Sequence, residues 1–467
     1  MNIKRLFRDF GFVISSNLLT LIISTIVILV VPKLIGVEEY GYWQLFMFYS
    51  GYLGLLPLGW LDGIYLRYGG EKYERLNKSL FHSQFILLMI MQSFFALIII
   101  IAAMIIHDKQ YSFILYALAI FLLIYIAQSF CKFVLQITNR IREYSEVTIL
   151  ANVIYVVTVI SLIVVNVRDF RLLIISFIFG NFVALLYAMY VLKDLFFQHY
   201  ANRKFWSLGE AAINIRVGSQ LLIANVAAML IIGVVRMGIQ HSWGVATFGK
   251  VSLTLSISNL LMVFINAISL IIFPKLKRID PDKVNGLYSV IRDILMPLIF
   301  FGMLIYFPIS YFIPLWLPKY DSALIYMSVL FPMIAYQSKF EILSNTFMKV
   351  LRMERQLLFI NVITLVISVV LTVISVFVLH NLTATIFVII IVMAIRSTIS
   401  ELYVKNKLHV KFSSEMLLEA VMVVLFILLS WYLSTFEAII GYMVILALYL
   451  LIKKNDIIRA VKRVKML

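Results

Sequence analysis

Long apolar runs separated by short polar segments follow one another from residue 10 almost to the end of the chain. A helix that crosses the hydrocarbon core of a bilayer needs about 20 mostly apolar residues, which is the length of these runs. The pattern therefore predicts about fourteen transmembrane helices. They are expected at residues 10–31, 42–66, 80–106, 111–131, 144–167, 172–192, 213–235, 246–273, 290–312, 321–348, 357–379, 382–404, 415–434 and 438–452.

Composition supports the same fold class. Of the 467 residues, 63% are hydrophobic and 13% are charged, whereas soluble domains carry about 25% charged residues. The net charge of +17 does not indicate nucleic-acid binding, because the basic residues form short clusters between apolar runs. Cys131 is the single cysteine and the six histidines lack ligand spacing, so no metal or other cofactor is predicted.

The basic residues also predict the orientation of the chain. With the N-terminus inside, 31 of the 40 Lys and Arg lie in inside loops, seven lie outside and two, Lys339 and Arg396, lie within spans. Positive charge concentrates on the cytoplasmic side of membrane proteins. We therefore expect a multi-pass protein of the bacterial cytoplasmic membrane with both termini in the cytoplasm.

The chain contains a weak internal sequence repeat at an offset of 203 residues, which pairs Lys33 with Arg236 and Gly41 with Gly244. A second short match, between residues 150–154 and 359–363, has an offset of 209. Six spans separate the copies, so the halves are expected to form a parallel repeat with an axis along the membrane normal. The predicted domains are an N-lobe of six helices at 1–200, a C-lobe of six helices at 201–411, and two further helices with a basic tail at 412–467.

Charged residues at membrane depth are costly and often line a cavity or face a partner. Glu341 shares one helical face with Gln337, Ser338, Ser344 and Asn345, whereas Lys339 lies about 200° around the same helix and is expected to face a neighbouring helix. Such polar groups also serve simply to join helices in a bundle, and this alternative stays open. Asp62 is expected near the inner interface, where Arg67 is a local partner.

Three motifs carry a family resemblance. The stretch Val31-Pro-Lys-Leu-Ile-Gly-Val-Glu-Glu-Tyr-Gly-Tyr-Trp43 and the stretch Leu58-Gly-Trp-Leu-Asp-Gly-Ile-Tyr-Leu-Arg-Tyr68 resemble the N-terminal signature of bacterial polysaccharide transporters, which are lipid-linked oligosaccharide flippases. Ile272-Phe-Pro-Lys-Leu276 is similar to the corresponding part of the second lobe. In contrast to flippase relatives, the first span has no basic residue between Arg8 and Lys33.

The resemblance implies an alternating-access carrier of undecaprenyl-pyrophosphate-linked oligosaccharide, with no enzymatic activity. By position, the candidate substrate-binding cations are Arg67, Lys132, Arg216, Lys339 and Arg396, and the candidate ion-coupling carboxylates are Glu341 and Asp62. Coupling to a sodium gradient, a proton gradient or the membrane potential is left open. The expected partners are the lipid-linked substrate, membrane lipids, a glycan polymerase and glycosyltransferases, and the expected state is a monomer.

Other function classes remain as alternatives. An ion-coupled multidrug antiporter of the same superfamily would also use two six-helix lobes with buried carboxylates, although two cations against one carboxylate near the midplane favour an anionic cargo. A membrane glycan polymerase or ligase would need a large outward loop, and no predicted outside loop exceeds roughly a dozen residues. A scaffold without transport activity is the remaining alternative.

Overall fold

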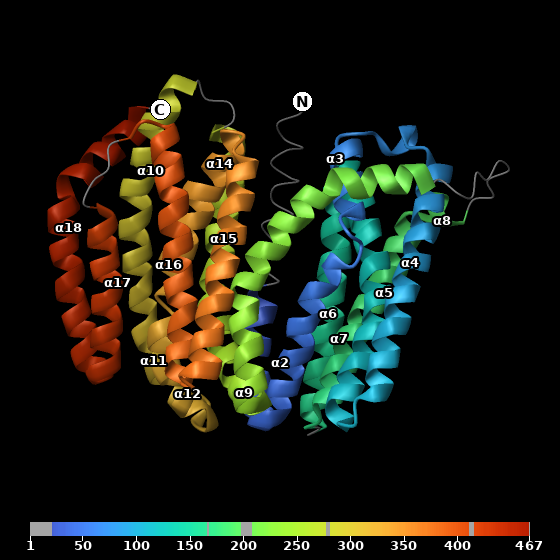
Figure 1. Ribbon diagram of the computed structural model, residues 1–467, viewed down its shortest axis with the longest axis horizontal. Helices are drawn as coiled ribbons and strands as arrows, with labels where there is room; N and C mark the ends of the chain where they lie inside the picture. Colours follow the sequence, from blue (N-terminus) through green and yellow to red (C-terminus); the bar gives the residue numbers. More distant parts are fainter. Residues whose placement is uncertain (1–20, 166–167, 198–207, 277–280, 411–414, 467) are drawn as a thin grey trace. The chain divides into compact units, whose positions relative to one another are not determined.

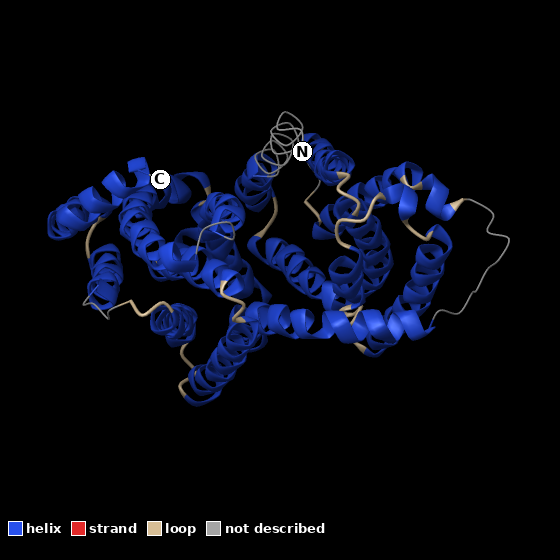
Figure 2. Ribbon diagram, turned by 90° about the horizontal axis from the view of Figure 1, so that it is seen from above, coloured by secondary structure: helices blue, strands red, loops and turns tan. Residues whose placement is uncertain are grey.

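A computed structural model describes residues 21–165, 168–197, 208–276, 281–410 and 415–466, and every element in this part of the chain is helical (Figures 1 and 2). Two compact units divide the chain at Met1–Val226 (unit 1) and Ala227–Leu467 (unit 2). Their boundary falls inside one long helix, α9 (Leu208–Leu276), whereas the sequence predicted a boundary at 200. The two C-terminal helices belong to unit 2.

Unit 1 contains a helix at Leu21–Leu34, the only described part of the first predicted span, and the first turns of α9. Its other elements are α2 (Val37–Tyr52), η1 (Leu53–Leu55), α3 (Trp60–Tyr68), η2 (Tyr73–Arg75), α4 (Lys78–Ile105), α5 (Lys109–Ile137), α6 (Ile141–Val164), α7 (Phe170–Val191) and α8 (Lys193–Phe196). Asp108 caps α5 by accepting from the backbone N–H groups of Gln110 and Tyr111, and Asp169 caps α7 in the same way. α4 packs on α5, α6 packs on α7, and α5 also packs on α7 (Figure 1).

Unit 2 begins with the second half of α9, and its last two helices are those predicted to follow the second six-helix lobe. Its other elements are α10 (Pro281–Gly302), η3 (Met303–Ile305), α11 (Tyr306–Trp316), η4 (Pro318–Tyr320), α12 (Asp321–Leu330), α13 (Met333–Lys339), the π-helical turn η5 (Phe340–Asn345), α14 (Thr346–Val350), α15 (Glu354–Val373), the π-helical turn η6 (Ile374–Val378), α16 (Leu382–Lys407), α17 (Glu415–Tyr432) and α18 (Thr435–Met466). α18 packs on α10, and α17 packs on α12 and α18 (Figure 1).

Each of the fourteen predicted spans corresponds to helical structure. Ten helices of the described chain are long and apolar enough to cross a membrane, and α9 alone accounts for two predicted spans. The other predicted spans correspond to the short helix Leu21–Leu34, to α2 with α3, and to α12 through α14. The chain is therefore an all-helical membrane protein, as the hydropathy pattern predicted.

Two predicted spans differ in shape from the expectation. The span at 42–66 is not continuous, because Leu58 (φ 54°) and Gly59 (φ 84°) adopt left-handed backbone between α2 and α3. The predicted loop between the seventh and eighth spans is a single non-helical residue, Gly244, with φ 78° and ψ 178°. Apolar content does not encode the backbone dihedrals of single residues, which set the position of both interruptions.

The glycines paired by the predicted internal repeat lie in different structural settings. Gly41 was paired with Gly244, yet Gly41 lies inside α2 whereas Gly244 interrupts α9. Gly36, the residue before α2, directly precedes a helix in unit 1, as Gly244 does within α9. The starts of α5 and α12, and those of α7 and α16, are separated by the same offset in both pairs, which is longer than the predicted one.

Candidate functional site

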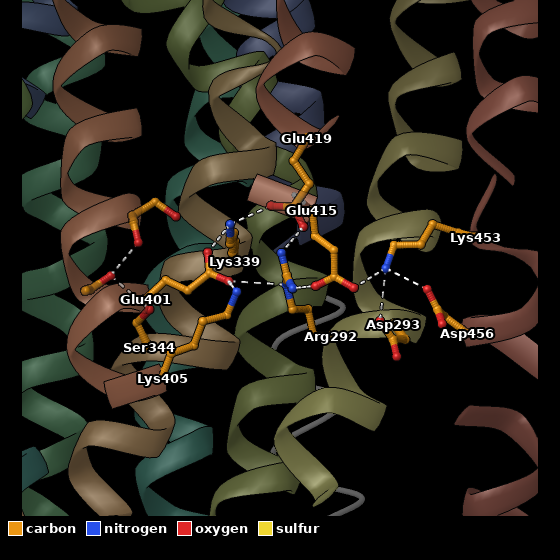
Figure 3. A network of polar contacts seen from close by, with 12 residues as sticks. Arg292, Asp293, Lys339, Ser344, Glu401, Lys405, Glu415, Glu419, Lys453 and Asp456 are labelled. Carbon is orange, nitrogen blue, oxygen red and sulfur yellow. Dashed lines mark hydrogen bonds and ion pairs between the residues drawn. The ribbon is translucent and has the colours of Figure 1, made fainter. Parts of the chain in front are cut away.

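Unit 2 contains a network of ion pairs that joins five helices (Figure 3). At its centre, Arg292 of α10 contacts three carboxylates: Glu401 at 3.2 Å, Glu419 at 2.8 Å, and Glu415. Lys339 of α13 contacts Glu419 at 2.5 Å and also Glu401, and Lys405 contacts Glu401 at 2.9 Å. The side chain of Glu401 is 0% exposed, so its charge depends on these three cations.

Lys453 of α18 extends the network away from this centre. Its ammonium contacts Asp456 at 3.0 Å, Asp293 at 3.6 Å, and Glu415 (Figure 3). The carboxylate oxygens of these three acids lie within 4.8 Å of one another, close enough for a metal ion. Because Lys453 contacts all three, its ammonium already supplies the positive charge that such an ion would bring.

The network explains how α17 and α18 are held on unit 2. α17 contributes Glu415 and Glu419, which neutralise cations of α10 and α13. Sequence reasoning missed the network, because its members come from five separate segments. The nearest signal was the helical spacing of Glu415 and Glu419, four residues apart on one face of a predicted span.

Lys339 and Glu341 face different neighbours, as their angular separation predicted. Lys339 is 4% exposed and its ammonium is engaged by α16 and α17. Glu341 lies in η5, is half-buried, and accepts a hydrogen bond of 2.8 Å from the Asn345 side chain. π-helical turns are rare and occur frequently at functional sites. The face that carries Glu341 is therefore a stronger candidate for contact with cargo or an ion than the face that carries Lys339.

Arg396 is buried beside this turn without a carboxylate in contact. Its Nε and one terminal nitrogen both donate to Asn361 Oδ1, at 3.1 and 2.8 Å. The guanidinium lies over the ring of Phe340, 3.7 Å from the centroid. Among the described residues, no carboxylate therefore forms an ion pair with Arg396. Its contact with Phe340 places it next to the segment that carries Lys339 and Glu341.

Arg67 takes part in a smaller polar cluster in unit 1. It donates to Asn214 Oδ1 at 2.6 Å and pairs with Glu210 at 2.8 Å, both on α9. Asn214 in turn donates to Gln84, which accepts from the indole of Trp60 at 2.8 Å. This cluster ties α3 and α4 to the beginning of α9.

The other three candidates in unit 1 do not join that cluster directly. Asp62 is half-buried in the first turn of α3, and Lys132 is half-buried in α5; neither has an ion-pair partner among the described residues. Arg216 is exposed on α9, two residues beyond Asn214. Sequence reasoning singled out none of the partners Glu210, Gln84 or Asn214.

No protein-family model and no curated protein sequence matches the chain. Solved structures do share its fold. A structure of the lipid II flippase MurJ in an inward closed conformation matches with a TM-score of 0.64 and 11% identity, covering 97% of this chain and 99% of that one. An inward-facing multidrug resistance MATE family transporter of the MOP superfamily matches with a TM-score of 0.60 and 12% identity, covering 84% and 98%. The chain thus has the fold of MOP-superfamily transporters.

Proposed function

We propose that the chain is an alternating-access transporter that moves an undecaprenyl-pyrophosphate-linked oligosaccharide from the inner to the outer leaflet of the bacterial cytoplasmic membrane. The extent of the match to the flippase carries this proposal. That match covers 97% of the chain, and the remainder is shorter than the 18 residues of α17 alone. The flippase match must therefore include most of α17 and α18 together.

The match to the multidrug transporter is shorter. It covers 84% of the chain, and the unmatched remainder is longer than α17 and α18 combined. Ion pairs tie α17 to α10 and α13, and Lys453 ties α18 to α10 and α17, so both helices are an integral part of unit 2. The flippase match therefore accounts for more of this chain than the antiporter match does, and this difference supports the flippase proposal.

The proposed cargo carries a pyrophosphate, and the side chains suited to it are cations without a direct acidic partner. Arg396 meets this description, and its planar guanidinium is suited to bidentate contact with phosphate oxygens. Lys132 and Arg216 are retained as secondary candidates. Lys339 and Arg67 are already paired with carboxylates, so we assign them to positioning the helices that line the transport path.

Ion coupling is assigned to Glu341, with Asp62 as the second candidate. Replacing Glu341 by Gln keeps the side-chain shape and removes the charge. If this carboxylate binds the driving ion, Glu341→Gln inserts normally but transports without dependence on the gradient. Partnership with a glycan polymerase and glycosyltransferases, and action as a monomer, belong to the same proposal.

The proposal is tested by complementation in a bacterium that lacks its polysaccharide flippase. Expression of the chain should restore surface glycan and should leave the minimum inhibitory concentration of cationic drugs unchanged. The rival function is an ion-coupled multidrug antiporter, which the Glu341 carboxylate and the TM-score of 0.60 favour. Raised drug resistance without restored glycan would replace the flippase proposal by this rival.

A further inference from the structure

A cavity of about 230 Å³ lies beside the ion network, between α10, α16 and α18. It is found where the apolar runs of these helices stop: α16 ends at Lys407, and Lys453 is the first charged residue after the apolar part of α18. In a membrane protein this is the depth of the lipid headgroups. The cavity is lined by Tyr288, Lys405, Arg459 and Arg463, among others.

The charges around the cavity leave one cation in excess. Five acids of the network, Asp293, Glu401, Glu415, Glu419 and Asp456, are matched by five bases, Arg292, Lys339, Lys405, Lys453 and Arg459. Arg463 lines the same cavity, is exposed, and has no ion-pair partner in the described part of the chain. The site therefore offers a single unmatched positive charge.

A buried hydroxyl supplies a second and independent indication. Tyr288 is 0% exposed, and its hydroxyl has no hydrogen-bond partner among the described residues. An unpaired buried hydroxyl is unfavourable, and a ligand oxygen in the cavity that Tyr288 lines would accept a hydrogen bond from it. A cation and an unpaired donor on one cavity at headgroup depth are the groups that hold a phosphate oxygen.

We infer that this cavity binds the phosphate diester of an anionic phospholipid such as phosphatidylglycerol. A diester carries one negative charge, which matches the single excess cation. The pyrophosphate of a lipid-linked sugar carries more than one negative charge and would leave the balanced network with an excess of acid. The inference holds whatever cargo the protein transports.

The test uses purified full-length protein in detergent, titrated with short-chain phosphatidylglycerol or with phosphatidylcholine of the same chain length. Binding is read by native mass spectrometry and by thermal unfolding. Arg463→Gln should weaken phosphatidylglycerol binding about fivefold, the value of one surface cation toward anionic lipid. Tyr288→Phe removes only the hydroxyl and should also weaken it roughly threefold or more.

Lys454→Gln is the matched control, because Lys454 is an exposed cation of the same helix that does not line the cavity. It should bind phosphatidylglycerol as the wild type does. An equal loss in Lys454→Gln and Arg463→Gln would show diffuse attraction to a basic tail and overturn the inference. Equal binding of phosphatidylcholine, or displacement of phosphatidylglycerol by inorganic pyrophosphate, would overturn it as well.

Discussion

Lys339 lies 2.5 Å from Glu419 in a setting where both side chains are almost fully buried. Removing one member of a buried ion pair leaves an uncompensated charge and costs about 3–5 kcal/mol. Lys339→Met should fall at the low end of this range, because Arg292 still contacts Glu401 and Glu419. The expected result is a lower unfolding temperature in detergent and reduced abundance in the membrane.

The control for this prediction is Lys349→Met, since Lys349 is exposed and lies in α14, one residue beyond the predicted span that contains Lys339. It should leave stability unchanged. The double variant Lys339→Met with Glu419→Gln should regain part of the lost stability, because neither partner is then left charged alone. A Lys339→Met protein of normal stability that fails only in transport would contradict the network and return Lys339 to cargo binding.

Arg396 should behave in the opposite way. It has no carboxylate in contact among the described residues, so its replacement breaks no ion pair. We expect Arg396→Ala to lower surface glycan at least tenfold at near-normal abundance, and Arg396→Lys to retain part of the activity because charge persists without the planar fork. Normal export by Arg396→Ala would remove this residue from the transport path.

For single residues, the sequence predicted some features and not others. The angular separation of Lys339 and Glu341 follows from 3.6 residues per turn and is correct in the structure. The identity of the partners was not predictable, because Glu401, Glu415 and Glu419 are brought to Lys339 and Arg292 by packing between segments distant in sequence. Periodicity within one helix contains no information on that packing.

Among the helices, α3 and α9 cross at backbone contact in unit 1. A Cβ atom on Gly63 would lie 1.9 Å from the backbone oxygen of Asn214, and one on Gly218 would lie 1.9 Å from that of Gly59. Spacing of small residues by four lets membrane helices approach to backbone contact. The crossing explains why Gly59 and Gly63 flank the sequence Trp-Leu-Asp.

Gly63→Ala should therefore destabilise the protein by roughly 3 kcal/mol, the upper end of overpacking costs, because two backbones must separate. Gly209→Ala is the control on the same α9, since a Cβ atom added to Gly209 would meet nothing within 4 Å. Unfolding temperature and membrane abundance should fall for the first variant only. Equal stability of the two proteins would show that the helices do not make this contact.

Helix positions were largely predictable from hydropathy, whereas interruptions within helices were not. The bend at Leu58 and Gly59 and the π-helical turn η5 lie inside predicted spans, and the break at Gly244 is a single residue where a longer loop was predicted. Hydropathy averages over a window of residues and reports burial in lipid, not the dihedral angles of single residues. The register of the repeat is not set by hydropathy either, because apolar helices match one another at several offsets.

For the molecule as a whole, the charge distribution predicts which ends of the helices face the cytoplasm. In unit 2, the turn between α14 and α15, the end of α16, the start of α17 and the end of α18 lie at one end (Figure 1). Reporter fusions after Arg75, Arg203, Lys277 and Lys465 should report cytoplasm, and fusions after Lys109 and Lys319 should report the outside. Two or more reversed reporters would refute the fourteen-span topology.

Translocation of a lipid-linked oligosaccharide is measured most directly with purified protein in liposomes. A fluorescent undecaprenyl-pyrophosphate-linked oligosaccharide is placed in both leaflets, and a membrane-impermeant quencher is added outside. With the wild-type protein, we predict that nearly all fluorescence becomes quenchable over time, whereas Arg396→Ala and protein-free liposomes stop at the outer-leaflet fraction. Wild-type liposomes that also stop at that fraction, while transporting an organic cation, would contradict the proposed function.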